Sequence, residues 1–353
     1  MPEDNLPTPS ATAATPHVRR KRYSGKNPRR FEEKYKEHGS DAATLAKVIA
    51  SGKTPAGTHR PIMVPEILAV LAPQPGEIAA DCTLGYSGHT QELLARLAPG
   101  GRLVGLDTDP IELPKTVERL RALGFGEDVF TAHRTNYAGL PQVLSGLGIE
   151  GADMILADLG ISSMQIDDPT RGFSVKLDGP LDMRMNPQRG VPASVLLQKT
   201  KTDDLARMLE LNADEPNAVK LSLTLAEQHY ATTRQLAEAI RATLPYLGKE
   251  DADLTVRRVF QALRIAVNDE FSALDMFLRN LPFCLKPGGR VAILTFHSGE
   301  DRRVKKAFDA GYYDGTYSDI AKSVGRPTPE EQHSNPRSAP AKLRWAVRAK
   351  TAG

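Results

Sequence analysis

Short apolar runs recur along the chain and predict buried strands, because a strand covered on both faces needs a nearly continuous apolar sequence. The predicted strands span residues 77–81, 102–107, 129–133, 153–158 and 290–297. Apolar residues with helical spacing lie between them, at residues 65–71, 90–97 and 113–123. This alternation predicts a doubly wound α/β sheet. Residues 311–340 look irregular, and residues 342–348 predict a last edge strand.

The alternation stops after Asp168. Residues 192–246 place apolar side chains at spacings of three and four with no strand between them, which indicates successive helices. An amphipathic helix predicted over residues 257–281 restores the α/β pattern. We therefore expect an α/β domain formed by residues 58–165 and 258–350, interrupted by a helical, substrate-recognising subdomain at residues 166–257.

Residues 1–57 differ in composition from the rest of the chain and predict a basic, largely disordered extension with a short helix at residues 42–50. Seven Lys and Arg residues against two acidic residues give residues 1–30 a charge of +5. The remainder of the chain, whose total charge is +3, therefore carries −2. Such a basic run either binds phosphate backbones through counterion release or is a solvated tail, and both interpretations stay open.

The composition argues against several classes of protein. Hydrophobic residues make up 40% of the 353 residues, and no apolar run approaches the length of a membrane span. We find no signal peptide, because the N-terminus lacks an apolar segment. Cys82 and Cys284 are too few for a disulfide framework or a zinc site. Buried free thiols and a cytoplasmic protein are expected.

A glycine-containing loop follows the first predicted strand, with the pattern Asp81-x-Thr83-x-Gly85-x-x-Gly88. Asp107 ends the next strand, 22 residues after Gly85, where an acid can accept hydrogen bonds from ribose hydroxyls. The loop lacks the glycine pattern of dinucleotide-binding proteins, which suits a cofactor without a pyrophosphate, such as S-adenosylmethionine. The alternative is a structural tight turn with a capping aspartate.

A second polar loop follows Asp158 at the end of another buried strand. Ligands of open α/β sheets bind outside the carboxyl ends of the strands, so Asp158, Ser162 and Gln165 indicate a site. The alternative is that Asp158 caps the next helix and that Ser162 and Ser163 only form the turn. His89 and His297 stand without an evident third ligand, so a metal site is not expected.

Several motifs together resemble the MraW family of small-subunit rRNA methyltransferases, also called methyltransferase H. The motifs that carry the resemblance are His59-Arg-Pro-Ile-Met-Val, Asp81-Cys-Thr-Leu-Gly-Tyr-Ser-Gly-His-Thr, Gly105-Leu-Asp-Thr-Asp-Pro, Ile155-Leu-Ala-Asp-Leu-Gly-Ile-Ser-Ser-Met-Gln-Ile-Asp, Arg171-Gly-Phe-Ser, Asp178-Gly-Pro-Leu-Asp-Met-Arg-Met, Val259-Phe-Gln-Ala-Leu-Arg-Ile-Ala-Val-Asn-Asp-Glu and Phe296-His-Ser-Gly-Glu-Asp-Arg. The resemblance implies a Rossmann-like class I methyltransferase fold with a helical insertion. It also implies S-adenosylmethionine as cofactor and N4-methylation of a cytidine in the decoding region of small-subunit rRNA.

The resemblance assigns roles to individual residues. Cofactor contacts are expected at Ser87, Gly88, His89, Asp107, Tyr137, Asp158 and Gln165. The substrate candidates are Phe173 and Phe296, which could stack on an unstacked cytidine, and Arg171 and Arg184, which could grip phosphates. The proton acceptor stays open between Asp158 and His297. The chain departs from the usual family pattern at Tyr86 and Ser87, where glycine is usual, and at Gly299, where leucine is usual.

The expected partner is small-subunit rRNA or the small ribosomal subunit, without membrane contact, and the sequence leaves the oligomeric state open. Three alternatives remain at this stage. They are an NAD-dependent dehydrogenase, a non-catalytic RNA-binding or ribosome-assembly factor with the same fold, and a methyltransferase that acts on another RNA amine.

Overall fold

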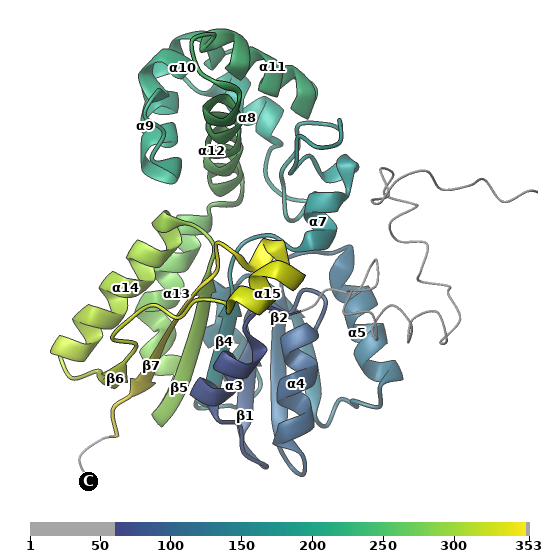
Figure 1. Ribbon diagram of the computed structural model, residues 1–353. Helices are drawn as coiled ribbons and strands as arrows, with labels where there is room; N and C mark the ends of the chain where they lie inside the picture. Colours follow the sequence, from purple (N-terminus) through teal and green to yellow (C-terminus); the bar gives the residue numbers. More distant parts are fainter. Residues whose placement is uncertain (1–60, 351–353) are drawn as a thin grey trace, which may run out of the picture.

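The computed structural model describes residues 61–350 and contains a seven-stranded sheet with strand order β3-β2-β1-β4-β5-β7-β6 (Figure 1). The strands are β1 (Ile78–Asp81), β2 (Arg102–Asp107), β3 (Phe130–Arg134), β4 (Ala152–Asp158), β5 (Leu285–Thr295), β6 (Tyr317–Ile320) and β7 (Lys342–Arg348). β1 to β5 pair in parallel, and β7 runs antiparallel to β5 and β6. The predicted Rossmann-like α/β fold is confirmed.

The strand predicted at residues 342–348 is confirmed as β7, but its expected place at the edge is wrong, because β6 pairs with β7 and takes the edge. The expectation of an irregular segment at residues 311–340 is wrong in part for the same reason. That segment contains the end of helix α14 (Ser298–Tyr313), the strand β6 and the short helix α15 (Pro329–Ser334). β6 reads Tyr-Ser-Asp-Ile, and its two middle residues are exposed, so it lacks the apolar run that reveals a buried strand.

Helices cover both faces of the sheet, as a doubly wound fold requires. One face packs against α3 (Val64–Leu71), α4 (Gly88–Leu97) and α5 (Glu112–Ala122). The other packs against α6 (Leu140–Gly146), α13 (Glu270–Cys284) and α14. The side chains of Cys82 and Cys284 are buried as free thiols, as predicted, in the core of this second face. No helix within residues 61–350 is both long and apolar enough to cross a membrane.

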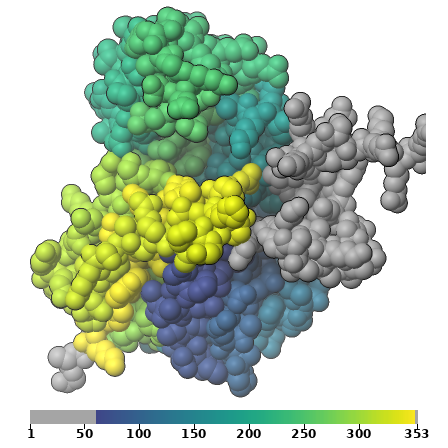
Figure 2. Space-filling view, in the orientation of Figure 1, coloured from purple at the N-terminus to yellow at the C-terminus, as the bar shows by residue number. Residues whose placement is uncertain are grey.

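The insertion forms a separate helical lobe above the sheet (Figures 1 and 2). It comprises α8 (Ala193–Lys199), α9 (Thr202–Ala213), α10 (Ala218–Leu225), α11 (Thr233–Thr243) and α12 (Lys249–Asn268). Apolar residues from all five helices form a core of their own, distinct from the two cores that flank the sheet. We call residues 172–268 the helical lobe below.

The single helix predicted over residues 257–281 is wrong, because the chain breaks between α12 and α13. Asp269 adopts a left-handed conformation (φ 51°), which Asp tolerates better than most residues. Val259 and Leu263 of α12 lie in the core of the helical lobe, whereas Leu274 of α13 lies in the core of the sheet. The expected boundary at residue 257 falls inside α12, and we propose Asp269 as the boundary instead.

Two short helices, α7 (Ser163–Asp167) and η3 (Pro169–Arg171), lead from β4 to the helical lobe. Two others lie within the sheet domain: η2 (Tyr137–Gly139) between β3 and α6, and η4 (Pro336–Ser338) between α15 and β7. The predictions for residues 1–57, including the disordered extension and the helix at residues 42–50, lie outside the described part of the chain.

Candidate functional site

Acidic side chains end three adjacent strands of the sheet. Asp81 ends β1, Asp107 ends β2 and Asp158 ends β4. Asp81 is 2% exposed and accepts hydrogen bonds from Thr90 Oγ1 at 2.6 Å and from the Thr83 amide at 3.1 Å. The Thr83 hydroxyl in turn accepts a hydrogen bond from the Asp158 amide at 2.6 Å. Asp81 and Thr83 therefore organise the strand ends, and Asp107 and Asp158 face the space beside them.

Asp107 holds the glycine loop in place. Its Oδ2 accepts a hydrogen bond from the Gly85 amide at 2.8 Å, and its Oδ1 accepts one from the Asp109 amide at 2.9 Å. Each carboxylate oxygen has a second lone pair, so both can still accept a bond from a ribose hydroxyl. Burial raises the pKa of Asp107 to about 6, which leaves the group ionised at neutral pH but sensitive to mild acid.

Asp158 carries a buried oxygen that lacks a partner. Its Oδ1 accepts no hydrogen bond from any described residue, and its Oδ2 lies 3.7 Å from His89 Nδ1. Burial raises the pKa of Asp158 to about 6, although the neighbouring His89 opposes this shift. A buried acceptor without a donor costs free energy, so a native protein that keeps one often does so for a ligand. Asp158 therefore fits a cofactor donor.

Ser87, Gly88 and His89 form the turn into α4, and their own side chains are largely engaged. Ser87 has φ 68° and is 1% exposed, which explains why glycine is usual nearby in the family. A Cβ atom at Gly88 would lie 3.0 Å from Pro61 atoms. His89 Nε2 lies 2.9 Å from the Ile62 carbonyl oxygen. One ring nitrogen of His89 is therefore engaged by the backbone, and the other faces Asp158.

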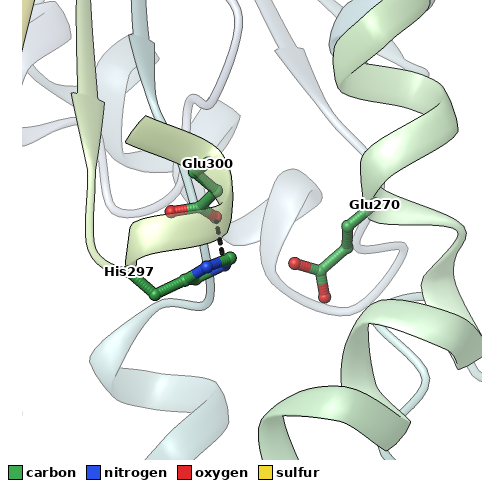
Figure 3. A group of neighbouring side chains, drawn as sticks. All are labelled: Glu270, His297 and Glu300. Carbon is green, nitrogen blue, oxygen red and sulfur yellow. Dashed lines mark ion pairs between the residues drawn. The ribbon is translucent and has the colours of Figure 1, made fainter. Parts of the chain in front are cut away.

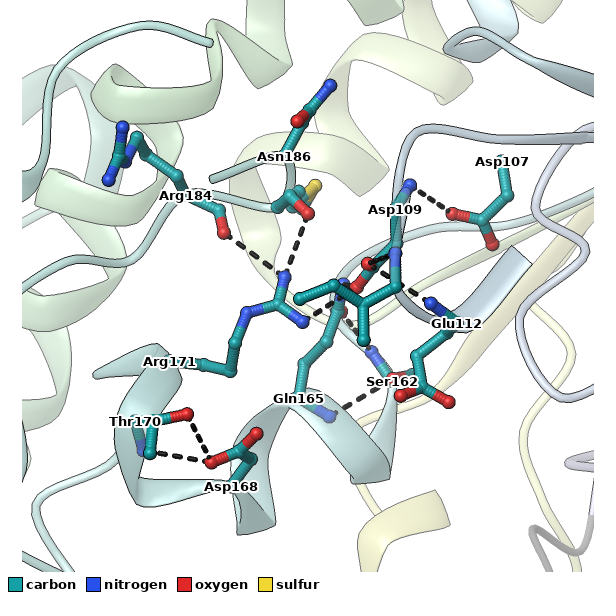
Figure 4. Close-up of polar contacts among 12 residues, drawn as sticks. Asp107, Asp109, Glu112, Ser162, Gln165, Asp168, Thr170, Arg171, Arg184 and Asn186 are labelled. Atoms are coloured by element: carbon teal, nitrogen blue, oxygen red, sulfur yellow. Dashed lines mark hydrogen bonds and ion pairs between the residues drawn. The ribbon is translucent and has the colours of Figure 1, made fainter. Parts of the chain in front are cut away.

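Gln165 belongs to a polar network with Asp109 (Figure 4). Ser162 and Gln165 form a reciprocal capping box at the start of α7, so the helix after this loop is capped by Ser162 and not by Asp158. Gln165 Nε2 also donates to Asp109 Oδ2 at 2.8 Å. The structure thus places Gln165, which is 7% exposed, beside the loop that carries Asp107.

His297 lies near two buried glutamates, Glu270 and Glu300 (Figure 3). Its Nε2 is 3.1 Å from Glu300 Oε1, and neither ring nitrogen forms a hydrogen bond of good geometry within the described residues. Although burial opposes it, the pKa of Glu300 is lowered by His297 and Arg264. The Tyr137 hydroxyl donates to the Glu270 carbonyl at 3.2 Å, so Tyr137 joins this cluster to the expected cofactor site.

The sequence argument that no third ligand lies near His297 is wrong. Glu270, His297 and Glu300 place ligand atoms within 4.8 Å of one another, a spacing that admits a cation. Both carboxylate oxygens of Glu270, however, accept hydrogen bonds from Arg264 at 2.8 Å. Arg264 already supplies a buried positive charge, so the cluster is explained as a hydrogen-bonded ion-pair group and we assign no metal to it.

Two of the four substrate candidates are buried and already engaged in contacts within the protein. Arg171 is 6% exposed and its guanidinium bonds to Asp109 and to two backbone carbonyls, so it cannot grip phosphates. Phe173 lies in the core of the helical lobe at 8% exposure and presents no free ring face for a base. The guanidinium of Arg184 is partly engaged, because its Nε and Nη2 donate to the two carboxylate oxygens of Asp182.

Phe296 keeps its candidacy, because it lies at the end of β5 beside the Asp158 loop. It is only partly buried, and a Cβ atom at Gly160 would lie 3.8 Å from its ring. Sequence analysis assigned no role to Asp109, Glu270 or Glu300, although all three stand in the motifs quoted above. The spacing His297-x-x-Glu300 at a helix start is a signal that could have revealed the last of them.

Comparison with known proteins agrees with this geometry. Residues 56–349 match the MraW methylase family. The chain belongs to that family. It is 48% identical to the ribosomal RNA small subunit methyltransferase H 1 of Agathobacter rectalis, over 94% of this chain and 98% of that protein. It is 37% identical to the ribosomal RNA small subunit methyltransferase H of Acidothermus cellulolyticus, over 84% and 95% of the two chains.

Among solved structures, an S-adenosylmethionine-dependent O-methyltransferase from Thermotoga maritima matches with a TM-score of 0.40 at 10% identity, covering 88% of this chain and 72% of that one. This partial overlap adds nothing to the family assignment. Membership of the MraW methylase family makes the chain an S-adenosylmethionine-dependent methyltransferase and removes the dehydrogenase alternative. The open acceptors of Asp107 and Asp158 fit that cofactor.

Proposed function

We propose that this chain transfers the methyl group of S-adenosylmethionine to N4 of a cytidine in the decoding region of small-subunit rRNA, in the cytoplasm. The names of its relatives support a small-subunit rRNA substrate. The observation that carries the proposal is the pair of strand-end acids. Asp107 and the unpartnered Asp158 offer acceptors at the carboxyl edge of the sheet, directly below the helical lobe.

The cofactor supplies an activated methyl group, and the protein aligns the attack and excludes water. Asp107 would accept bonds from the ribose hydroxyls, and Asp158 would accept one from another polar group of the cofactor. A cytosine amine is a weak nucleophile, so a group that accepts its hydrogen bond favours reaction. Asp158 and His297, the two proton-acceptor candidates from the sequence, lie at the ends of β4 and β5. Asp158 Oδ1 and both ring nitrogens of His297 are buried and have no hydrogen-bond partner among the described residues.

The substrate would enter between the strand ends and the helical lobe. Phe296 is the candidate for stacking on the unstacked base, because Phe173 is committed to the lobe core. The chain beyond residue 30 carries a net charge of −2, so charge alone would bind free RNA weakly. We therefore propose that the protein recognises the shape of RNA that ribosomal proteins have already ordered.

Methyl incorporation tests this proposal on three substrates prepared from a strain that lacks the enzyme: protein-free rRNA, small subunits and whole ribosomes. We expect the label in small subunits or partly assembled particles, with mass mapping locating it on a cytosine amine. Asp158→Asn serves as the inactive control. Incorporation into protein-free rRNA at an equal or higher level contradicts recognition of assembled RNA, and label on a base carbon or ribose contradicts N4 chemistry.

A further inference from the structure

A buried ion pair connects the cofactor-facing loop to the base of the helical lobe. Arg171 Nη1 donates to Asp109 Oδ2 at 2.9 Å, and the two side chains are only 7% and 2% exposed. Asp109 lies two residues after Asp107, and Arg171 ends η3 where the chain enters the lobe. Water and salt screen such a buried pair little, so loss of one partner leaves an uncompensated charge.

Asp109 forms hydrogen bonds with two of the expected cofactor residues, Asp107 and Gln165 (Figure 4). Its amide donates to Asp107 Oδ1, and its Oδ2 accepts a bond from Gln165 as well as from Arg171. Its Oδ1 accepts bonds from the Ile111 and Glu112 amides at the start of α5. Asp109 is therefore fixed within the same loop that holds Asp107.

Arg171 bonds to the chain segment that leads into the lobe, and that segment in turn bonds to the last residue of α12, where the chain leaves the lobe. Its Nη2 donates to the Arg184 carbonyl at 3.2 Å and to the Met185 carbonyl at 2.8 Å. The Met185 amide donates to Asn268 Oδ1 at 2.7 Å, and Asn268 Nδ2 donates to the Met183 carbonyl at 2.8 Å. Asn268 is the last residue of α12, directly before the break at Asp269. One guanidinium thus ties both segments to the cofactor loop.

We propose that Asp109 and Arg171 are positioning residues that couple cofactor binding to the orientation of the helical lobe. A cofactor that restrains Asp107 and Gln165 also restrains Asp109, and Arg171 passes this restraint to residues 183–185 and to Asn268. By linkage, RNA that fixes the lobe raises cofactor affinity by the same factor by which the cofactor raises RNA affinity. The proposal rests on the proposed function only for the identity of that RNA.

A second Arg–Asp pair between the same two parts of the protein provides a matched control. Arg302 of α14 donates to both oxygens of Asp214, which follows α9, at 2.9 and 3.0 Å. The side chains of Arg302 and Asp214 are 56% and 50% exposed, and within residues 61–350 no hydrogen bond or ion pair joins them to the cofactor loop. Arg302→Met removes an ion pair between the two parts of the protein without touching Asp107, Asp109 or Gln165.

Hydrogen exchange with and without saturating S-adenosylmethionine tests the coupling on the full chain, without RNA. In the wild type, we expect the cofactor to slow exchange at residues 183–185 and 266–270 by about fivefold or more, the lower range of allosteric coupling. Asp109→Asn, which retains acceptors for the α5 amides, and Arg171→Met should each bind cofactor at higher concentration but lose this response. Arg302→Met should keep it.

The proposal is overturned if the wild type shows no cofactor-dependent slowing at these residues, or if Asp109→Asn shows the full wild-type response at saturation. The wild-type measurement alone decides against it even where Arg171→Met fails to fold. An incorrect rRNA substrate would leave the exchange response intact and abolish only methyl incorporation, so the two failures are distinguishable.

Discussion

Buried charged side chains at the strand ends of the sheet differ from those at the base of the helical lobe in whether they have partners. At the strand ends, Asp107 and Asp158 are buried with raised pKa values, and Asp158 keeps an oxygen without a partner. In and at the base of the lobe, Arg171 and Arg184 are paired with aspartates. The strand ends thus retain an open acceptor on Asp158, whereas the charges of Arg171 and Arg184 are satisfied by acids of the protein itself.

The unpartnered acid at the strand ends can contribute to ligand binding, whereas the paired arginines stabilise the fold. Acids that are costly to bury remain at the strand ends because a ligand can satisfy them there, and their cost lowers the stability of the ligand-free protein. The arginines that sequence analysis offered to phosphates are already engaged. These two side chains therefore stabilise the lobe and its base.

The largest effect is expected from substitution of Phe173, which lies in the core of the helical lobe, in contrast to Phe296 beside the site. Phe173→Ala should destabilise the protein by about 3–5 kcal/mol, because it empties a buried position in the lobe. Phe296→Ala, at a partly buried ring beside Gly160, should cost less stability and lower methyl transfer instead. Chemical denaturation and single-turnover rates of both variants measure this contrast, and equal unfolding free energies would contradict it.

Asp158→Asn should move cofactor affinity and stability in opposite directions. Loss of a charge-assisted bond of about 1.5–3 kcal/mol weakens binding by about 10- to 150-fold. The raised pKa of Asp158 means that its ionised form destabilises the folded protein, increasingly as pH rises from its unfolded value near 3.8 to about 6. Removal of that charge should raise Tm at pH 7.5 and leave it nearly unchanged at pH 3.5.

Calorimetry and thermal melts of the cofactor-free variant measure the two effects. Asp153→Asn is a suitable control, since that carboxylate pairs with Lys286 at the opposite end of β4. A lower Tm for Asp158→Asn at pH 7.5, or unchanged cofactor affinity, would remove Asp158 from the site.

Apolar periodicity was sufficient to predict the sheet of this fold, since β2 was placed at its observed bounds and β1, β3 and β4 within a residue of theirs. It failed where the structure depends on local backbone geometry. The break at Asp269 leaves the apolar stripe of α12 and α13 continuous in the sequence, so one helix was predicted. β6 carries almost no apolar signal because it is a short edge strand.

The site was predicted in part for a similar reason. Asp107 and Asp158 stand at the ends of apolar runs, which sequence analysis can detect. The partners of Arg171 are Asp109, Arg184 and Met185, and only the folded chain brings Asp109 to it, 62 residues away. A sequence shows that an arginine is present but not whether its charge is already paired, so the ion pair of Arg171 could not be predicted.

The smallest effect is expected from deletion of residues 1–50, which tests whether positive charge outside the lobe contributes to RNA binding. The deletion removes the seven clustered basic residues before Glu32 and should leave cofactor affinity unchanged. Association with rRNA should weaken at low salt and converge with the wild type at high salt, because salt screens phosphate contacts. Equal affinities at low salt would refute a role for this segment.

Proton release on cofactor binding tests most directly whether the strand-end acids form the cofactor site. Titration calorimetry at pH 6, in buffers of different ionisation enthalpy, measures it. Asp107 and Asp158, with pKa values of about 6, are partly protonated in the cofactor-free protein, and cofactor donors favour their ionised forms because a carboxylate is the stronger acceptor. We predict net proton release, reduced in Asp158→Asn and reduced further when Asp107→Asn is added. Binding without proton release at pH 6, or with proton uptake, would contradict this account.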